Sequence, residues 1–207
     1  MGDGRGFVVA GVRPSERLIL TAAHCLPSWP VAKPAEWDTL QKNLVAPLGA
    51  QPSVWADCQF VDPVGDLAIL GSVDGQEFPT EADAFERLVE GAMPLPVGDV
   101  TLTEPVWLLA LDGEWFSCPV EPTGWGLILS KAGRPIVGGM SGSPIVQHGA
   151  AVGLVSGAEG VGAPSEYRDG YAPRLVRHLP GWLLHAGHTR NDWRAGLERQ
   201  RQRDSLE

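Results

Sequence analysis

The sequence predicts an all-β protein built from short antiparallel strands, and three observations lead to that prediction. The chain has 26 glycines and 18 prolines in 207 residues, which favours frequent turns over long helices. Between residues 100 and 156, short apolar segments alternate with Gly, Pro and Asp at the spacing of strands joined by turns. Helical patterns of apolar residues are confined to 35–45, 81–90 and the segment after 171. Together these patterns indicate a closed or sandwiched antiparallel sheet.

The first half of the chain is expected to contain four strands and two short helices. The strands are expected at 7–13, 17–22, 53–61 and 67–71, each an apolar segment bounded by turn residues. The helix at 35–45 would place Trp37, Leu40 and Leu44 on one face. The helix at 81–90 would begin after Thr80, whose hydroxyl can cap the first turn.

The second half is expected to be almost entirely strand up to residue 156, and helical near its end. The expected strands are 100–103, 106–111, 114–120, 125–130, 144–147 and 151–156. Helical segments follow at 172–179, 182–185 and about 191–203, the last one polar and rich in arginine. The sequence has no internal repeat and no low-complexity linker, and its length fits one large domain or two small ones.

Composition excludes several classes of partner and cofactor. The formal net charge of −9 argues against nucleic acid or an anionic membrane as the main partner. No apolar run reaches the length that spans a membrane, and the run from Phe7 to Val12 lacks a cleavage site after it. The three cysteines are widely spaced and odd in number, which fits neither a disulfide framework nor a zinc site. We therefore expect a cytoplasmic protein without metal or cofactor.

One segment has the character of a catalytic turn. In Gly138-Gly139-Met140-Ser141-Gly142-Ser143-Pro144, a serine lies among glycines and a strand-like run follows. A nucleophilic serine needs a sharp turn and unobstructed backbone N–H groups that can bind an oxyanion. Glycines meet both needs because they accept positive φ and leave room for a substrate. By itself the pattern is equally compatible with an ordinary hairpin loop.

A base and an orienting acid for Ser141 can be sought in the first half of the chain. Among five histidines, His24 alone directly follows a buried-looking strand, through two alanines, so its ring can be held in a fixed direction. Asp66 opens the apolar run 67–70, which draws its carboxylate inward, where it needs a partner such as His24 Nδ1–H. Asp62 precedes Pro63 and is more simply a turn residue.

Three segments, taken in order, resemble the chymotrypsin/trypsin family of serine peptidases. These segments are Thr21-Ala22-Ala23-His24-Cys25, Asp66-Leu67-Ala68-Ile69-Leu70 and Gly139-Met140-Ser141-Gly142-Ser143-Pro144. The segment 4–9 also looks like the first strand of bacterial trypsin-like members, and 153–157 is similar to the strand that lines their primary pocket. The resemblance covers about residues 4–160.

The resemblance implies a fold and a reaction. The fold would be two antiparallel six-stranded β-barrels, at about 1–95 and 96–170, with a C-terminal helical tail at 171–207. Residues 1–207 would form one trypsin-like peptidase domain, a serine endopeptidase in which Ser141 attacks, His24 carries the proton and Asp66 holds the tautomer. The N–H groups of Gly139 and Ser141 would form the oxyanion hole.

The resemblance also implies a primary pocket and a specificity. Its floor would be Pro135, and its other candidate lining residues are Ile136, Val137, Ser156, Gly157 and Ala158. These groups are uncharged, so we expect cleavage after a small or aliphatic residue. Glu159 is the one nearby group that could attract a basic side chain instead. The expected partner is a protein or peptide substrate.

The sequence departs from the family pattern at four points. Cys25 lacks its usual disulfide partner, because no cysteine occurs from 1 to 24. There is no Ile-Val-Gly-Gly mature N-terminus, Met140 replaces the usual aspartate, and Ser143 replaces the second glycine. Activation by a clipped N-terminus is therefore not expected. The turn at Gly138-Gly139 would instead be shaped by local packing, by substrate or by a regulatory protein partner.

Two other functions fit parts of the pattern. An α/β-hydrolase would use Ser141, Asp169 and His178 in that order, but its elbow requires glycine at 143 and its fold requires alternating βαβ units. A catalytically inactive trypsin-fold binding module is the non-enzymatic alternative. A serine-directed fluorophosphonate probe distinguishes that module from an active peptidase.

Overall fold

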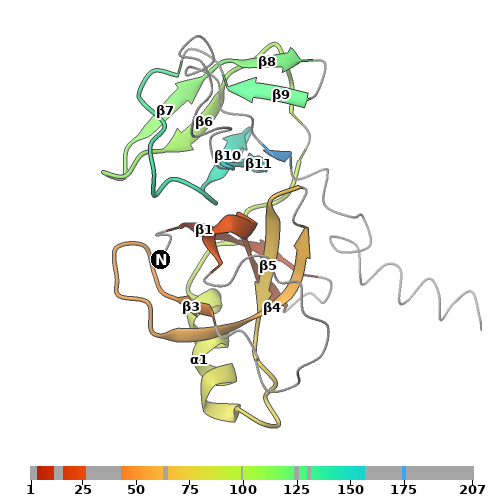
Figure 1. Cartoon of the computed structure of the whole chain (residues 1–207), viewed down its shortest axis with the longest axis vertical. Helices are drawn as coiled ribbons and strands as arrows, with labels where there is room; N and C mark the ends of the chain where they lie inside the picture. The colour runs from red at the N-terminus through yellow and green to blue at the C-terminus, as the bar shows by residue number, and fades with distance from the viewer. Residues whose placement is uncertain are drawn as a thin grey trace, which may run out of the picture.

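The computed structural model describes residues 4–11, 16–26, 43–62, 65–98, 100–123, 126–129, 132–156 and 174–175. These residues form two antiparallel sheets of five strands each, a separate two-stranded ribbon, a short 3-10 helix and one α-helix. The two sheets occupy two lobes that follow one another along the long axis of the molecule (Figure 1).

The first sheet has the strand order β1-β2-β5-β4-β3. The strand bounds are β1 (Gly6–Ala10), β2 (Arg17–Thr21), β3 (Asn43–Val45), β4 (Val54–Asp62) and β5 (Leu67–Gly71). All five residues of β5 are buried, as expected for the central strand of a sheet. The register pairs Thr21 with Ala68, so the end of β2 lies beside the beginning of β5. This pairing brings the residues after β2 close to those before β5.

The second sheet has the strand order β12-β11-β10-β6-β7. Its bounds are β6 (Val106–Leu109), β7 (Trp115–Cys118), β10 (Pro144–Gln147), β11 (Ala150–Leu154) and β12 (Arg174–Leu175), and the ribbon is β8 (Val120–Thr123) with β9 (Gly126–Leu129). A two-residue turn with positive φ at His148 and Gly149 joins β10 to β11. Two consecutive positive φ values are the signature of the turn that matches strand twist in hairpins.

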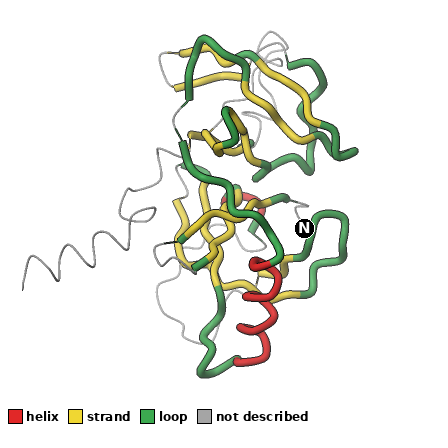
Figure 2. The backbone as a smooth tube through the Cα atoms, turned by 180° about the vertical axis from the view of Figure 1, so that it is seen from behind, coloured by secondary structure: helices red, strands yellow, loops and turns green. Residues whose placement is uncertain are grey.

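The α-helix α1 (Pro79–Glu90) covers the first lobe (Figures 1 and 2). It buries Phe85 and Val89 in a core cluster shared with the first sheet. The residue that caps it is Phe78, and Pro79 occupies the first turn, where its missing N–H costs nothing. The predicted cap at Thr80 is therefore wrong, because the helix starts at Pro79, two residues before the predicted start at 81.

Apolar packing joins the two lobes. One core cluster combines residues of β1, β2 and β5 with two residues of β11: Phe7, Val9, Leu18, Leu20, Ala22, Leu67, Ile69, Ala151 and Leu154. The connecting segment after α1 adds two parallel bridges, Val9 with Leu95 and Val97 with Ala151. The connection between the lobes thus pairs with a strand of each lobe.

The structure differs from the predicted elements at several places. Residues 43–45 form β3 instead of ending a helix, because they pair with Val54–Ala56 of β4. Residues 101–104 form a turn instead of a strand, since the buried Gln147 side chain bonds both the N–H and the C=O of Thr101. Arg174 and Leu175, inside the predicted helix 172–179, form the strand β12 instead and pair with β11.

Other predictions are tested only in part. The remainder of the segments 35–45 and 171–207 lies outside the described residues. The described strands number five in each sheet, so two closed six-stranded barrels stay a prediction. The antiparallel pairing of both sheets contradicts the α/β-hydrolase alternative, which needs a parallel sheet. Within the described ranges, no helix is long and apolar enough to cross a membrane.

Candidate active site

His24 lies in a single 3-10 turn, η1 (Ala23–Cys25), directly after β2. Ala22 and Ala23 are fully buried, and the Ala23 N–H donates to the carbonyl of Asp66 at 3.2 Å. The small side chains allow this turn to pack closely against the beginning of β5. The imidazole itself is 38% exposed, so a rigid backbone presents it to solvent.

Asp66 holds His24 at two points. The His24 backbone N–H donates to Asp66 Oδ1 at 2.9 Å, and His24 Nδ1 lies 2.8 Å from Asp66 Oδ2. An ionised carboxylate only accepts hydrogen bonds, so Nδ1 carries the proton in this pair. In the neutral ring the other nitrogen, Nε2, is then left unprotonated and able to accept a proton. The carboxylate therefore sets both the direction and the tautomer of the ring.

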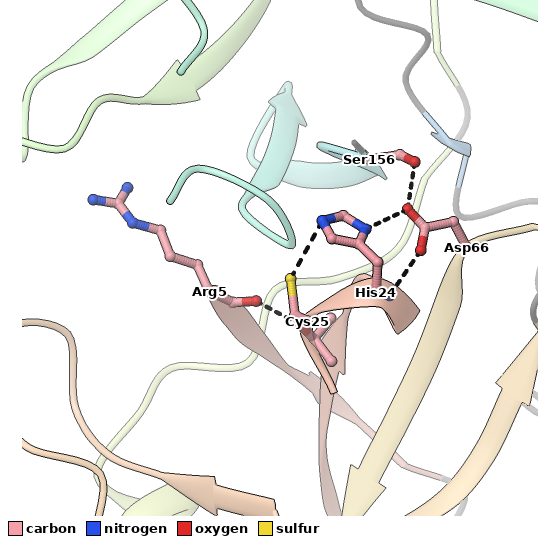
Figure 3. A network of polar contacts seen from close by, with 6 residues as sticks. Arg5, His24, Cys25, Asp66 and Ser156 are labelled. Carbon is pink, nitrogen blue, oxygen red and sulfur yellow. Dashed lines mark hydrogen bonds and ion pairs between the residues drawn. The ribbon is translucent and has the colours of Figure 1, made fainter. Parts of the chain in front are cut away.

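Ser156 supplies a third donor to Asp66 from the other lobe. Its hydroxyl donates to Asp66 Oδ2 at 2.5 Å, from the residue two positions after β11 (Figure 3). Burial alone would raise the pKa of the Asp66 carboxyl. The hydrogen bonds from Ser156 and His24, with the charge of His24, outweigh burial, and the pKa of Asp66 is lowered. Asp66 is thus held in its ionised form.

The backbone of Asp66 is in the left-handed region, with φ of 53°. Non-glycine residues rarely adopt this conformation, although Asp and Asn do so several times more often than others. Strain of this kind persists only where the surroundings enforce it, and here the His24 turn bonds both the carbonyl and the side chain of Asp66.

The turn around Ser141 is tightly folded. Gly139 and Gly142 have φ of 89° and 80°, which glycine adopts without penalty. The amides of Met140, Gly142 and Ser143 donate to the carbonyls of Val137, Val155 and Met140, respectively. In the described part of the chain, the N–H groups of Gly139 and Ser141 have no such acceptor. The turn thus leaves the two predicted oxyanion donors available.

The Ser141 turn lies against the first lobe through Arg5. The backbone N–H of Arg5 donates to the carbonyl of Ser141 at 2.7 Å, and Thr21 Oγ1 donates to the carbonyl of Arg5 at 2.6 Å. Thr21 is three residues before His24, so Arg5 links the turn that carries Ser141 to the segment that carries His24. No hydrogen bond joins Ser141 Oγ to His24 Nε2 among the described contacts, whereas Nε2 contacts Cys25 Sγ at 3.7 Å (Figure 3).

The predicted pocket residues lie in different environments. Pro135 and Val137 are exposed, Val137 by 45%, whereas Ile136 is 5% exposed and packs in the core of the second lobe. Ser156 is buried and bonds Asp66, a contact that the sequence did not reveal. Gly157, Ala158 and Glu159 lie outside the described residues, as do Asp169 and His178.

Two departures from the family pattern, the unpaired Cys25 and the apolar Met140, can be examined in the structure. All three cysteines are free thiols. Burial and then the Asp66 charge raise the pKa of Cys25 to about 11, so its thiol stays protonated near neutral pH. Met140 is 1% exposed and packs in the core of the second lobe. The buried Met140 side chain thus anchors the turn in the core of the second lobe. The part of the chain described here has no cluster of three or more metal-ligating side chains.

Comparisons with known proteins identify the fold. No known protein-family profile matches the sequence, and no curated protein does. The serine protease domain of the Sesbania mosaic virus polyprotein matches with a TM-score of 0.53 and 18% identity, over 89% of both chains. A mutant of human heparin binding protein matches with a TM-score of 0.48 and 15% identity, over 88% of this chain and 94% of that chain. A glutamic acid specific serine protease matches with a TM-score of 0.45 and 14% identity, over 86% of this chain and 90% of that chain. The first of these likenesses shows a chymotrypsin-like serine protease fold.

Proposed function

We propose that this chain is a serine endopeptidase that cleaves peptide bonds through an acyl-enzyme. The observation that carries the proposal is the His24–Asp66 pair, in which two hydrogen bonds of 2.8 and 2.9 Å orient the imidazole and fix its tautomer. The unprotonated Nε2 of this tautomer can act as a base toward a hydroxyl.

The proposed reaction assigns a role to each of these groups. Ser141 Oγ would attack the peptide carbonyl while its proton passes to His24 Nε2, and Asp66 would stabilise the resulting imidazolium without taking the proton. His24 would then protonate the leaving amine, and water would hydrolyse the acyl-enzyme by the same steps. The free N–H groups of Gly139 and Ser141 would bind the oxyanion.

The absent hydrogen bond between Ser141 and His24 supports a second candidate, an inactive binding module of the same fold. Catalytic hydrogen bonds are often long or poorly aligned without substrate and tighten in the complex. The two available oxyanion donors favour the peptidase, since a binding module has no use for them.

Specificity is proposed from the resemblance and from what the described residues show. Pro135, at the expected floor of the primary pocket, is exposed and uncharged, and Val137 beside it is also exposed. An uncharged, apolar surface favours an apolar side chain by about 0.8 kcal/mol per buried methylene. We therefore propose cleavage after small or aliphatic residues.

The test is fluorophosphonate labelling combined with digestion of a peptide library. The native protein should be labelled at Ser141 and should cut mainly after small or aliphatic residues. Ser141→Ala and His24→Ala should each lower turnover by roughly a factor of 10⁶, and the double variant should be hardly worse, because these groups act as a unit.

Ser143→Ala is the matched control. Ser143 lies in the same turn, and its buried hydroxyl has no hydrogen-bond partner among the described residues, so its removal should be nearly neutral. Absence of labelling in the folded native protein would support the inactive module instead. A library profile dominated by Arg or Lys would contradict the specificity while leaving the peptidase proposal intact.

A further inference from the structure

Arg5 is the residue that contacts both lobes and the Ser141 turn at once. It precedes β1, between Gly4 and Gly6, and it makes four hydrogen bonds. Two involve its backbone and two its guanidinium. The proposed reaction does not use Arg5.

The backbone of Arg5 lies between β2 and the Ser141 turn. Its N–H donates to the Ser141 carbonyl at 2.7 Å, and its carbonyl accepts from Thr21 Oγ1 at 2.6 Å. A Cβ at Gly142 would lie 1.9 Å from the Arg5 carbonyl oxygen and 2.7 Å from Thr21 Oγ1. The contact is therefore close enough to require glycine at position 142.

The side chain of Arg5 reaches the second lobe. Nη1 donates to the carbonyls of Leu109 at 2.9 Å and Ala110 at 3.1 Å, at the end of β6. The turn that follows is closed by a bond from the Ala110 N–H to the carbonyl of Glu114 at 2.8 Å. The guanidinium is directed away from the His24–Asp66 pair, so it does not contribute to that pair (Figure 3). The cation thus binds fixed backbone carbonyls of the second lobe, and no carboxylate among the described residues pairs with it.

We propose that Arg5 is a positioning residue that holds the Ser141 turn at a fixed place relative to His24, an inference that rests on the proposed peptidase function. His24 and Asp66 belong to the first lobe and Ser141 to the second, so their separation depends on contacts between lobes. The side chain of Arg5 fastens its segment to the second lobe, while its backbone bonds Thr21 of the first lobe and Ser141 itself. Charge-assisted bonds of this kind are stronger than neutral ones.

The first test separates positioning from substrate binding. Arg5→Met retains the backbone bonds and removes the guanidinium. Because a misplacement of about 1 Å can cost roughly a hundredfold, its kcat should fall about tenfold to a hundredfold, with KM changed less than about threefold. Arg5→Lys, which keeps a cationic donor, should recover part of the loss. Arg87→Met removes an exposed charge from α1 and should match the native enzyme. A raised KM at unchanged kcat would overturn the proposal, because Arg5 would then bind substrate.

The second test does not depend on activity. In the Ser141→Ala background, hydrogen–deuterium exchange of Arg5→Met should be faster in peptides covering 106–116 and 138–143, and unchanged in the α1 peptide 79–90. Unchanged exchange in all three peptides of the folded variant would overturn the positioning role. Faster exchange, together with a native protein that the fluorophosphonate probe does not label, would refute the peptidase and leave the structural clamp standing.

Discussion

At the scale of single residues, Asp66 carries the most constraint. Its carboxylate accepts three hydrogen bonds, two from His24 and one from Ser156, and its backbone adopts a positive φ. Asn is the informative substitution here, because it tolerates the left-handed conformation while losing the charge. Substitution by Ala would add backbone strain and confuse the two effects.

The lowered pKa of Asp66 predicts how stability depends on pH. The unfolded carboxyl titrates near its ordinary value of about 3.9, and the folded one titrates lower. Ionised Asp66 therefore contributes stability that is fully present above the unfolded pKa and is lost as the pH falls through the folded pKa. Urea unfolding of the native protein and Asp66→Asn should show a free-energy difference that is present at pH 5 and shrinks as the pH falls below about 4.

Asp112→Asn provides a comparison for that measurement. The bond from Arg134 holds the pKa of Asp112 low, but this pair is exposed. Asp112→Asn should therefore change the free energy of unfolding less than Asp66→Asn does. Its change should also decrease as salt is added, because salt screens surface ion pairs. A difference between native and Asp66→Asn that stays the same from pH 7 to 3 would contradict an ionised, hydrogen-bonded Asp66.

At the scale of elements, the turn from 138 to 143 shows how a short segment becomes a rigid platform. Its buried Met140 and the bond from the Gly142 N–H to the Val155 carbonyl fasten it to the second lobe. Two of its three glycines, Gly138 and Gly142, look alike in sequence. The structure gives them different roles, because nothing lies within 4 Å of a Cβ built at Gly138.

This contrast predicts the outcome of two alanine substitutions. Gly142→Ala meets the Arg5 carbonyl and must adopt φ of 80°, so it should destabilise the protein by about 2 kcal/mol or more. Gly138→Ala should change the free energy of unfolding by less than about 0.5 kcal/mol. Denaturant unfolding measures both. Equal effects of the two substitutions would mean that the close contact between Arg5 and Gly142 does not form.

At the scale of the whole molecule, the lobes share a core. Ala151 and Leu154 of β11 pack with residues of β1, β2 and β5, and the connecting segment pairs with both lobes. The candidate site lies at this junction. Ser141 precedes β10 and Ser156 follows β11 of the second sheet, whereas His24 follows β2 and Asp66 precedes β5 of the first sheet. Stability of the shared core and geometry of the site are thus linked.

A shared core predicts cooperative unfolding. Calorimetry of the native protein should show one transition, and Leu154→Ala should lower its free energy of unfolding by about 2–5 kcal/mol. Leu108→Ala, which belongs to the core of the second lobe alone, should also shift the whole transition. Two separate transitions in Leu108→Ala, with one unchanged from the native protein, would show that the lobes unfold independently.

The sequence by itself determined most of the strands and pointed to the candidate site residues. Alternating apolar runs predicted β1, β2, β4, β5, β10 and β11 close to their observed bounds, because burial on a sheet imposes that pattern. His24 could be selected because it follows a buried strand, and Asp66 because it precedes one. Ser141 could be selected because it lies in a turn rich in glycine. The helix at 35–45 was predicted wrongly at residues 43–45, since pairing with β4 overrides local helical pattern.

Only the tertiary structure decided how these residues are held. The hydroxyl of Ser156 reaches Asp66 from 90 positions away, and Arg5 reaches Leu109 and Ala110 across 104 and 105 positions. No local pattern encodes such contacts, because they depend on how two sheets pack and where their strands end. The sequence supplied a glycine on each side of Arg5, but glycine signals close approach without naming the neighbour. The candidate residues could therefore be selected from the sequence, whereas the contacts that hold them form only where the two lobes meet.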